Sequence, residues 1–227
     1  SGAALQPVIA VAPDGTLHAL WWDAVDGEQY VRTTGITETI WSSPIVVPDI
    51  FSERRVVTNT QTGKVRVTLV APREVRLIPD AQGNVHAFWY DVDNQLLEAK
   101  IQSAGKGNAT VLSDAVLSID AAADVSGTLR LAYVRPTDSQ DAPAGIYYRA
   151  TSGGPGWSAP SLVYASTYFR AAKPEEAHLS VAGDGLGRVL VAWDDLALGR
   201  SLYALSTDSG RTWSTPHAMN EGSNSQA

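Results

Sequence analysis

Residues 206–213 read STDSGRTW, and this short stretch is the strongest indication of the fold. A serine, an aspartate and a glycine precede a tryptophan at offsets that suit a tight turn between two antiparallel strands. The aspartate can accept hydrogen bonds from nearby backbone N–H groups, the glycine supplies a positive φ, and the tryptophan fills the core below. We therefore predict a structural turn, not a catalytic one. Its key residues are Ser206, Asp208, Gly210 and Trp213.

The same pattern recurs along the chain. A weaker copy, ATSGGPGW, stands at residues 150–157, and Trp-Ser-x-Pro begins at Trp41, Trp157 and Trp213. A second phrase, a glycine turn followed by an apolar run of about six residues, occurs four times. Its shared glycines, 44 to 68 residues apart, are Gly15, Gly83, Gly127 and Gly187. This spacing brackets the ~40–50 residues of a four-stranded propeller blade.

Composition agrees with a chain of many short strands. The 227 residues are 44% hydrophobic, with 19 Gly and 12 Pro that punctuate the apolar runs. No apolar run reaches the ~18 residues of a membrane span, and the absence of cysteine excludes disulfides and thiol chemistry. The net charge of -7 argues against a nucleic-acid partner. We expect neither a cofactor nor a bound metal.

The predicted fold is all-β: a β-propeller of four-stranded antiparallel blades. One domain spans residues 1–219, followed by a flexible tail at 220–227, and its four clear repeats cover 5–47, 75–114, 117–164 and 178–219. The basic segment 48–74 is either an insertion hairpin or a degenerate fifth blade. Four or five blades are few, and an open propeller leaves apolar faces and strand edges uncovered. The chain is therefore a compact propeller, part of a longer protein, or a unit completed by another copy.

The stretch at 206–213 resembles the Asp-box, or bacterial neuraminidase repeat, of the sialidase-like superfamily. Degenerate copies at 150–157 and 34–41 fit the decay of this motif from blade to blade. The resemblance implies a sialidase-like β-propeller that is extracellular or located in the cell envelope. It also implies that these boxes lie in turns between third and fourth strands, on the face away from the catalytic cleft of true sialidases.

Sialidase activity is not evident in the sequence. The chemistry requires arginines that bind a carboxylate, a tyrosine nucleophile polarised by a glutamate, and an aspartate acid/base. The family's Arg-Ile-Pro motif is approximated by residues 76–79, where an extra residue turns Arg76 to the other strand face. No ordered set of three arginines follows, so we assign no catalytic residue. Residues that could imitate the acid or the nucleophile are Asp91, Asp93, Tyr147, Tyr148 and Tyr203.

Pairs of acidic residues follow the predicted second strand of each blade. They are Asp23 and Asp26, Asp91 and Asp93, Asp138 and Asp141, and Asp194 and Asp195. A propeller would bring these loops to one face, together with the connection that carries Tyr168, Phe169 and Arg170. Carboxylates beside aromatic rings suit a sugar, because rings cover its C–H face and charged acceptors take its hydroxyls.

We therefore predict a non-catalytic binding module that recognises a glycan or a protein through this loop face. A glycoside hydrolase resembling exo-sialidases is the first alternative. A structural or assembly domain of a larger extracellular protein, including a homo-oligomer, is the second. The simplest interpretation of the acids is a solvated rim that keeps the protein soluble. His18 and His86 occupy equivalent positions in two repeats and are expected to be core histidines, not metal ligands.

Overall fold

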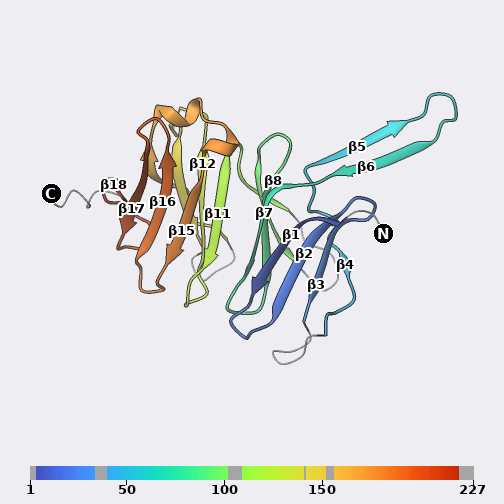
Figure 1. The fold of residues 1–227 in the computed structure, drawn as a ribbon, viewed down its shortest axis with the longest axis horizontal. Helices are drawn as coiled ribbons and strands as arrows, with labels where there is room; N and C mark the ends of the chain where they lie inside the picture. The colour runs from blue at the N-terminus through green and yellow to red at the C-terminus, as the bar shows by residue number, and fades with distance from the viewer. Residues whose placement is uncertain (1–3, 34–39, 102–108, 141, 152–155, 220–227) are drawn as a thin grey trace, which may run out of the picture. The chain divides into compact units, whose positions relative to one another are not determined.

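The computed structural model of the chain describes residues 4–33, 40–101, 109–140, 142–151 and 156–219 (Figure 1). The chain divides into two compact units, Ser1–Asp114 (unit 1) and Ala115–Ala227 (unit 2). The tail predicted at 220–227, Asp141, and most of the degenerate repeat at 34–41 lie outside the described residues.

Unit 1 contains two four-stranded antiparallel sheets and one hairpin. The first sheet consists of β1 (Ala4–Val11), β2 (Leu17–Asp23), β3 (Gly27–Arg32) and β4 (Ile45–Val46). The second consists of β7 (Arg73–Pro79), β8 (Val85–Tyr90), β9 (Leu96–Ile101) and β10 (Thr110–Ser113). Between them in the chain, β5 (Glu53–Thr58) and β6 (Val65–Val70) form a two-stranded sheet of their own.

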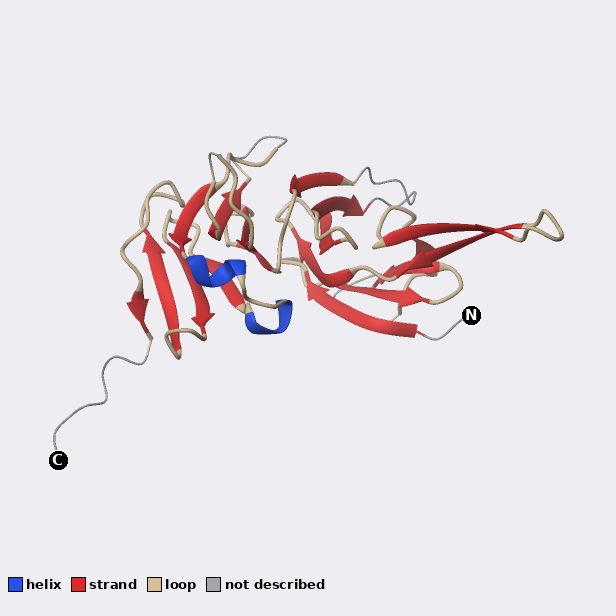
Figure 2. Ribbon diagram, turned by 90° about the horizontal axis from the view of Figure 1, so that it is seen from above, coloured by secondary structure: helices blue, strands red, loops and turns tan. Residues whose placement is uncertain are grey.

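Unit 2 repeats the arrangement without the hairpin. Its first sheet consists of β11 (Ser118–Ala123), β12 (Leu129–Arg135), β13 (Gly145–Ala150) and β14 (Ser161–Ala165). Its second consists of β15 (Leu179–Gly183), β16 (Val189–Asp195), β17 (Arg200–Ser206) and β18 (His217–Ala218). Two short 3₁₀ helices, η1 (Thr167–Arg170) and η2 (Pro174–Glu176), connect the sheets (Figure 2). The prediction of an all-β fold with four-stranded antiparallel sheets is confirmed.

Alternating side chains of the second strand in each sheet build the cores. In unit 1, Leu20 of β2 and Trp89 of β8 are fully buried in one apolar cluster, and in unit 2 Trp193 of β16 occupies the corresponding cluster. Each such side chain contributes roughly 1.5–3 kcal/mol by burial. Trp21 lies on the opposite face of β2, where Leu17 is exposed, and is itself only partly buried.

An aspartate explains why the glycine turn phrase recurs. In three sheets, one Oδ1 atom in the turn between the first two strands accepts hydrogen bonds from backbone N–H groups two and four residues later. For Asp80 these donors are Gln82 and Asn84, at 2.9 and 2.7 Å. Asp124 and Asp184 repeat the geometry. The repeat in the sequence is thus a requirement of backbone capping.

Candidate ligand-binding site

A cavity of about 750 Å³ lies within unit 1, at the end of the first sheet that carries the β2–β3 turn. Three segments enclose it: that turn, the connection 48–51, and the β5–β6 hairpin. The lining residues that matter for its chemistry are Trp22, Gly27, Asp49, Phe51, Arg54 and Arg66. The cavity therefore combines residues that are more than 40 positions apart in the chain.

Hydrogen bonds fix each wall of this cavity. The carboxylate of Asp23 accepts from the backbone N–H groups of Val25 and Asp26, at 2.8 and 3.1 Å, and so shapes the β2–β3 turn. The hairpin is tied to the body at Ser52, whose N–H donates to the carbonyl of Val70 at 2.8 Å. The indole Nε1–H of Trp89 donates to the carbonyl of Phe51 at 3.2 Å. The backbone of each wall is therefore fixed by hydrogen bonds that do not involve the side chains lining the cavity.

Glycine is required where the turn meets the hairpin. Gly27 has a φ of +83°, and a Cβ atom there would lie 3.3 Å from the Cδ1 atom of Leu69. A side chain at this position would be strained by the backbone conformation and crowded by β6. The absence of a side chain keeps the two walls of the cavity close together.

The lining offers two kinds of contact. The rings of Trp22 and Phe51 supply apolar surface, while Asp49, Arg54 and Arg66 supply one carboxylate and two guanidinium groups. Both arginines are exposed to solvent. Aromatic rings and a few convergent polar groups are typical of small-ligand sites, and guanidinium groups suit acidic or hydroxylated ligands.

Glu28 is a buried carboxyl residue that neighbours two cavity-lining residues in β2 and β3 without lining the cavity itself. It follows Gly27 in the chain, pairs with Trp22 across the β2–β3 ladder, and is only 2% exposed. Among the described residues its Oε2 atom has no hydrogen-bond partner, and burial raises the pKa of Glu28 to about 8. The group is therefore mostly protonated at neutral pH, because ionising it would leave an uncompensated charge in an apolar environment.

Most of the predicted acidic residues shape turns. Asp91 accepts hydrogen bonds from the N–H groups of Asp93 and Gln95, and buried Asp195 accepts one from Leu198. Asp194 accepts a hydrogen bond from the Ser201 hydroxyl at 2.7 Å. The side chains of Asp26 and Asp93 are exposed. Unit 1 holds Asp23, Asp26, Asp91 and Asp93, whereas unit 2 holds Asp194 and Asp195.

The aromatic connection in unit 2 departs from the prediction at one residue. Phe169 is fully buried in the core and cannot face a ligand, because η1 turns its ring inward. Tyr168 donates its hydroxyl hydrogen to the carbonyl of Glu176, and Arg170 forms an ion pair with Asp138 at 2.7 Å. Of the three predicted residues, Tyr168 is half-buried and Arg170 is exposed.

The stretch at 206–213 forms the turn between β17 and β18. The Ser206 hydroxyl accepts from the N–H of Gly210 at 2.8 Å, and hydrogen bonds from Thr212 and Ser206 lower the pKa of Asp208 to about 2. The indole Nε1–H of Trp213 donates to the Ser161 hydroxyl in β14 at 3.0 Å. This turn therefore fastens the second sheet of unit 2 to the first.

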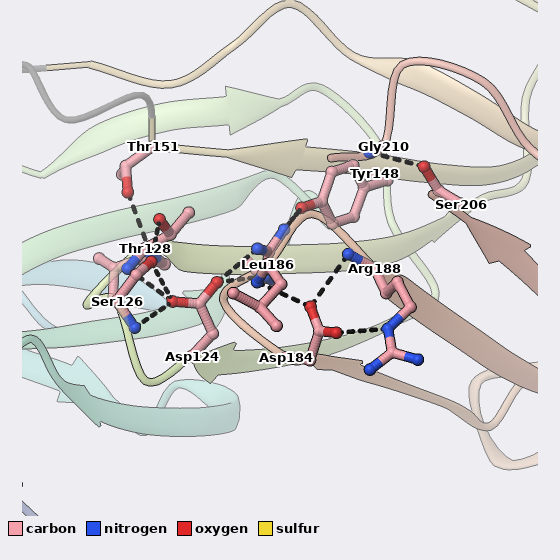
Figure 3. Close-up of polar contacts among 12 residues, drawn as sticks. Asp124, Ser126, Thr128, Tyr148, Thr151, Asp184, Leu186, Arg188, Ser206 and Gly210 are labelled. Atoms are coloured by element: carbon pink, nitrogen blue, oxygen red, sulfur yellow. Dashed lines mark hydrogen bonds and ion pairs between the residues drawn. The ribbon is translucent and has the colours of Figure 1, made fainter. Parts of the chain in front are cut away.

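A buried ion pair lies beneath this turn (Figure 3). The Asp124 carboxylate accepts hydrogen bonds from Nε and Nη2 of Arg130, and Nη1 of Arg130 donates to the Tyr148 hydroxyl at 2.6 Å. A second cavity of about 520 Å³ adjoins Arg130 and Tyr148. Its serine and threonine hydroxyls are largely engaged with the protein, as Ser161 is with Trp213, so we assign it a structural role.

The two aligned histidines also have local partners. His18 shares a hydrogen bond with the Tyr30 hydroxyl at 2.6 Å, and His86 contacts Glu98 at 2.7 Å and Asp80 at 3.4 Å. Within the described part of the chain, no group of three histidine, cysteine or acidic residues has the geometry to hold a metal.

The sequence prediction missed the residues that line the larger cavity. The basic composition of residues 48–76 was the available signal, since it contains six basic and three acidic residues in an otherwise acidic chain. It could not show that Arg54 and Arg66 would meet Trp22, because that contact depends on how the hairpin packs.

Comparison with known proteins shows similarity in structure alone. No family model and no curated protein sequence matches the chain. The intramolecular trans-sialidase from Ruminococcus gnavus, in complex with oseltamivir carboxylate, is 10% identical with a TM-score of 0.60, over 97% of this chain and 71% of that chain. The leech intramolecular trans-sialidase, complexed with 2,7-anhydro-Neu5Ac, is 9% identical with a TM-score of 0.58, over 97% and 51%.

The SapL1 lectin, in complex with alpha methyl fucoside, is 15% identical with a TM-score of 0.51, over 97% of this chain and 63% of that chain. This chain thus spans about half the length of the leech protein and less than two thirds of the lectin. Among the described residues, no helix has the length and apolar composition needed to cross a membrane. At identities of 9 to 15%, the similarity establishes that the chain has a sialidase-like all-β fold.

Proposed function

We propose that the chain is a non-catalytic glycan-binding module and that the glycan occupies the cavity of unit 1. The observation that carries this proposal is the combination of Trp22 and Phe51 with Arg54 and Arg66 around about 750 Å³. That volume lies within the range of roughly 300–1,000 Å³ found for small-ligand sites. The rings would cover the C–H face of a sugar, and the charged groups would bind its hydroxyl or acidic substituents.

The structural neighbours support a sugar as the ligand class. The leech trans-sialidase is complexed with 2,7-anhydro-Neu5Ac and the SapL1 lectin with alpha methyl fucoside. In this proposal the four sheets are blades of a β-propeller, at 5–47, 75–114, 117–164 and 178–219. Residues 206–213 are an Asp-box turn, and the protein acts outside the cell or in its envelope. Asp26 and Asp93, which are exposed residues of unit 1, belong to the binding rim.

A glycoside hydrolase is the second candidate, and Glu28 is the observation that favours it. Glycoside hydrolysis needs a protonated acid and a second carboxylate on opposite sides of the scissile bond. Burial raises the pKa of Glu28, which follows the lining residue Gly27 in the chain, to about 8, and Asp49 lines the cavity. We prefer binding because, among the described lining residues, Asp49 is the sole carboxylate.

A glycan array followed by calorimetric titration of the best ligand tests the proposal. We expect the double variant Arg54→Gln, Arg66→Gln to weaken binding at least about tenfold, because two charge-assisted hydrogen bonds are removed. Lys64→Gln is the matched control: it removes a charge from the same hairpin but outside the cavity lining.

Two results would contradict this proposal. If no glycan on the array is bound, or if the double variant binds as tightly as the wild type, the cavity is not a glycan site. Turnover of the bound glycan, lost in Glu28→Gln, would instead establish the hydrolase.

A further inference from the structure

The β5–β6 hairpin projects from the sheets of unit 1 as an arm, defined here as residues 53–70 (Figures 1 and 2). Side chains along each of its strands alternate between two faces, and residues paired across the strands share a face. We call one of these faces the valine face. It consists of three cross-strand pairs: Arg54 with Leu69, Val56 with Val67, and Thr58 with Val65. Apart from Arg54, these residues carry no charge.

The base of the valine face is a wall of the cavity in unit 1. Arg54, Val67 and Leu69 are among the residues that line this cavity. A Cβ atom at Gly27 would lie only 3.3 Å from the Cδ1 atom of Leu69, so the Leu69 side chain points toward the β2–β3 turn. That turn is another wall of the same cavity. The valine face therefore begins inside the cavity.

Beyond the cavity the same face continues outward as aliphatic surface. Val67, which lines the cavity, is 47% exposed, and its neighbours Val56 and Val65 are 60 and 62% exposed without lining it. Val65 is four residues from Leu69, which corresponds to about 13 Å along a strand. Contiguous exposed apolar side chains are typical of binding surfaces. This surface is continuous with the cavity wall, so the ligand in the cavity can also cover the valines.

The chemistry of the valine face selects the part of a ligand that it can bind. Valine side chains offer the hydroxyl groups of a sugar no hydrogen-bond partner, so a sugar placed there would lose hydrogen bonds to water without replacement. An aliphatic chain has no polar atoms and gains free energy when it covers such a surface. The ion pair between Glu53 and Arg55, at 2.7 Å, lies on the other face of the arm.

We propose that the ligand of the cavity is a glycoside with an aliphatic chain, and that this chain lies along the valine face while the sugar occupies the cavity. The inference rests on the proposed glycan site and specifies the class of its ligand. Trp22 and Phe51 contact the sugar, and Val56, Val65 and Val67 contact the chain.

Calorimetric titration of the full chain with methyl and octyl glycosides of the same sugar tests the proposal. The sugars are glucose, galactose, mannose, fucose and glucuronic acid, and each octyl glycoside is kept below the concentration at which it forms micelles. We expect the octyl glycoside of a bound sugar to bind at least about tenfold more tightly than the methyl glycoside. Burial of about two methylene groups is sufficient for that gain. The methyl glycoside should displace the octyl glycoside, because both place their sugar in the cavity.

Val56→Thr with Val65→Thr should reduce the preference for the octyl glycoside to about threefold or less. Threonine suits an exposed strand, and neither valine lines the cavity, so the affinity for the methyl glycoside should not change. Val57→Thr is the matched control. Val57 is 58% exposed and pairs with Arg66 on the other face of the arm, so this variant should keep the full preference.

Equal affinity of the wild type for the methyl and octyl glycosides would overturn this inference and leave the proposed function intact. An equal loss of preference in the double variant and in Val57→Thr would also overturn it. So would an octyl glycoside that the methyl glycoside cannot displace, because the chain would then bind without the cavity. If none of the glycosides binds, the proposed function and this inference are both contradicted.

Discussion

Units 1 and 2 each contain two four-stranded sheets, yet they differ in the hydrogen bonding of a buried ionisable group. In unit 2 the guanidinium of Arg130 is held by Asp124 and Tyr148. In unit 1 the carboxyl of Glu28 is equally buried, but its Oε2 atom has no hydrogen-bond partner among the described residues. A paired charge can stay ionised in the core, whereas an unpaired one is forced toward its neutral form.

The two units also differ in how their sheets are connected and in what lies beside them. In unit 2 the turn at 206–213 locks onto its neighbouring sheet through Trp213, whose ring meets Tyr148 edge to face at 5.3 Å between centroids. Unit 1 instead contains the β5–β6 hairpin and a cavity of about 750 Å³. Unit 2 thus joins its two sheets through this turn, whereas unit 1 contains the hairpin and the larger of the two cavities described above.

The largest effect is expected from breaking the buried pair of unit 2. Asp124→Ala should lower the free energy of unfolding by about 3–5 kcal/mol, because it leaves the Arg130 guanidinium buried with Tyr148 alone. Urea denaturation measures this loss. Asp184→Ala is the matched control: Asp184 caps the equivalent turn, but its partner Arg188 is exposed. Equal losses in the two variants would mean that turn capping, not the buried charge, matters.

The second effect comes from Glu28 and depends on pH. Burial raises the pKa of Glu28 from its ordinary value of 4.5 to about 8, so its contribution to stability is complete below pH 4.5 and is lost as the pH rises to about 8. Within that window the wild type should lose up to about 1.4 kcal/mol of stability per pH unit. Glu28→Gln should remove this slope and be more stable by about 3 kcal/mol at pH 7.

Denaturant titrations of both proteins at pH 5, 6, 7 and 8 measure the slope due to Glu28. Parallel curves for the wild type and Glu28→Gln would show that Glu28 ionises normally in the folded protein. The contrast between the two units in their buried charges would then be wrong.

The smallest of the three effects tests how tightly the 206–213 turn closes on its sheet. Gly210 has a φ of +86°, and a Cβ atom there would lie 2.1 Å from the Cε1 atom of Tyr148. Gly210→Ala should therefore cost about 2 kcal/mol in thermal or urea unfolding. Gly63 has a φ of +68°, and a Cβ atom there would have no atom within 4 Å. Gly63→Ala therefore measures the backbone strain alone and should lower the free energy of unfolding by about 1 kcal/mol.

A Gly210→Ala variant no less stable than Gly63→Ala would show that the turn can move away from Tyr148. The interlocking assigned to unit 2 would then be looser than its geometry implies.

Local features of the sequence were sufficient to predict the strands and turns of both units. Alternation with a period of two places Leu20 and Trp22 on one face of β2, and an aspartate beside a glycine caps its own turn, as at Asp80 and Asp124. These outcomes depend on residues within about four positions of one another. They are set by backbone geometry and hydrogen bonding, which neighbouring residues carry.

The candidate site could not be predicted in the same way, because its parts are distant in the chain. Three features arise when separate segments pack together: Trp22 and Arg66 line one cavity, Phe169 turns inward, and the Oε2 atom of Glu28 has no hydrogen-bond partner in the described part of the chain. Whether a ring is covered or a carboxyl is desolvated depends on the residues that surround it in the folded chain. The pattern of residue types along the sequence does not specify those surrounding residues. Local sequence therefore specifies the sheets, whereas packing creates the cavity and raises the pKa of Glu28.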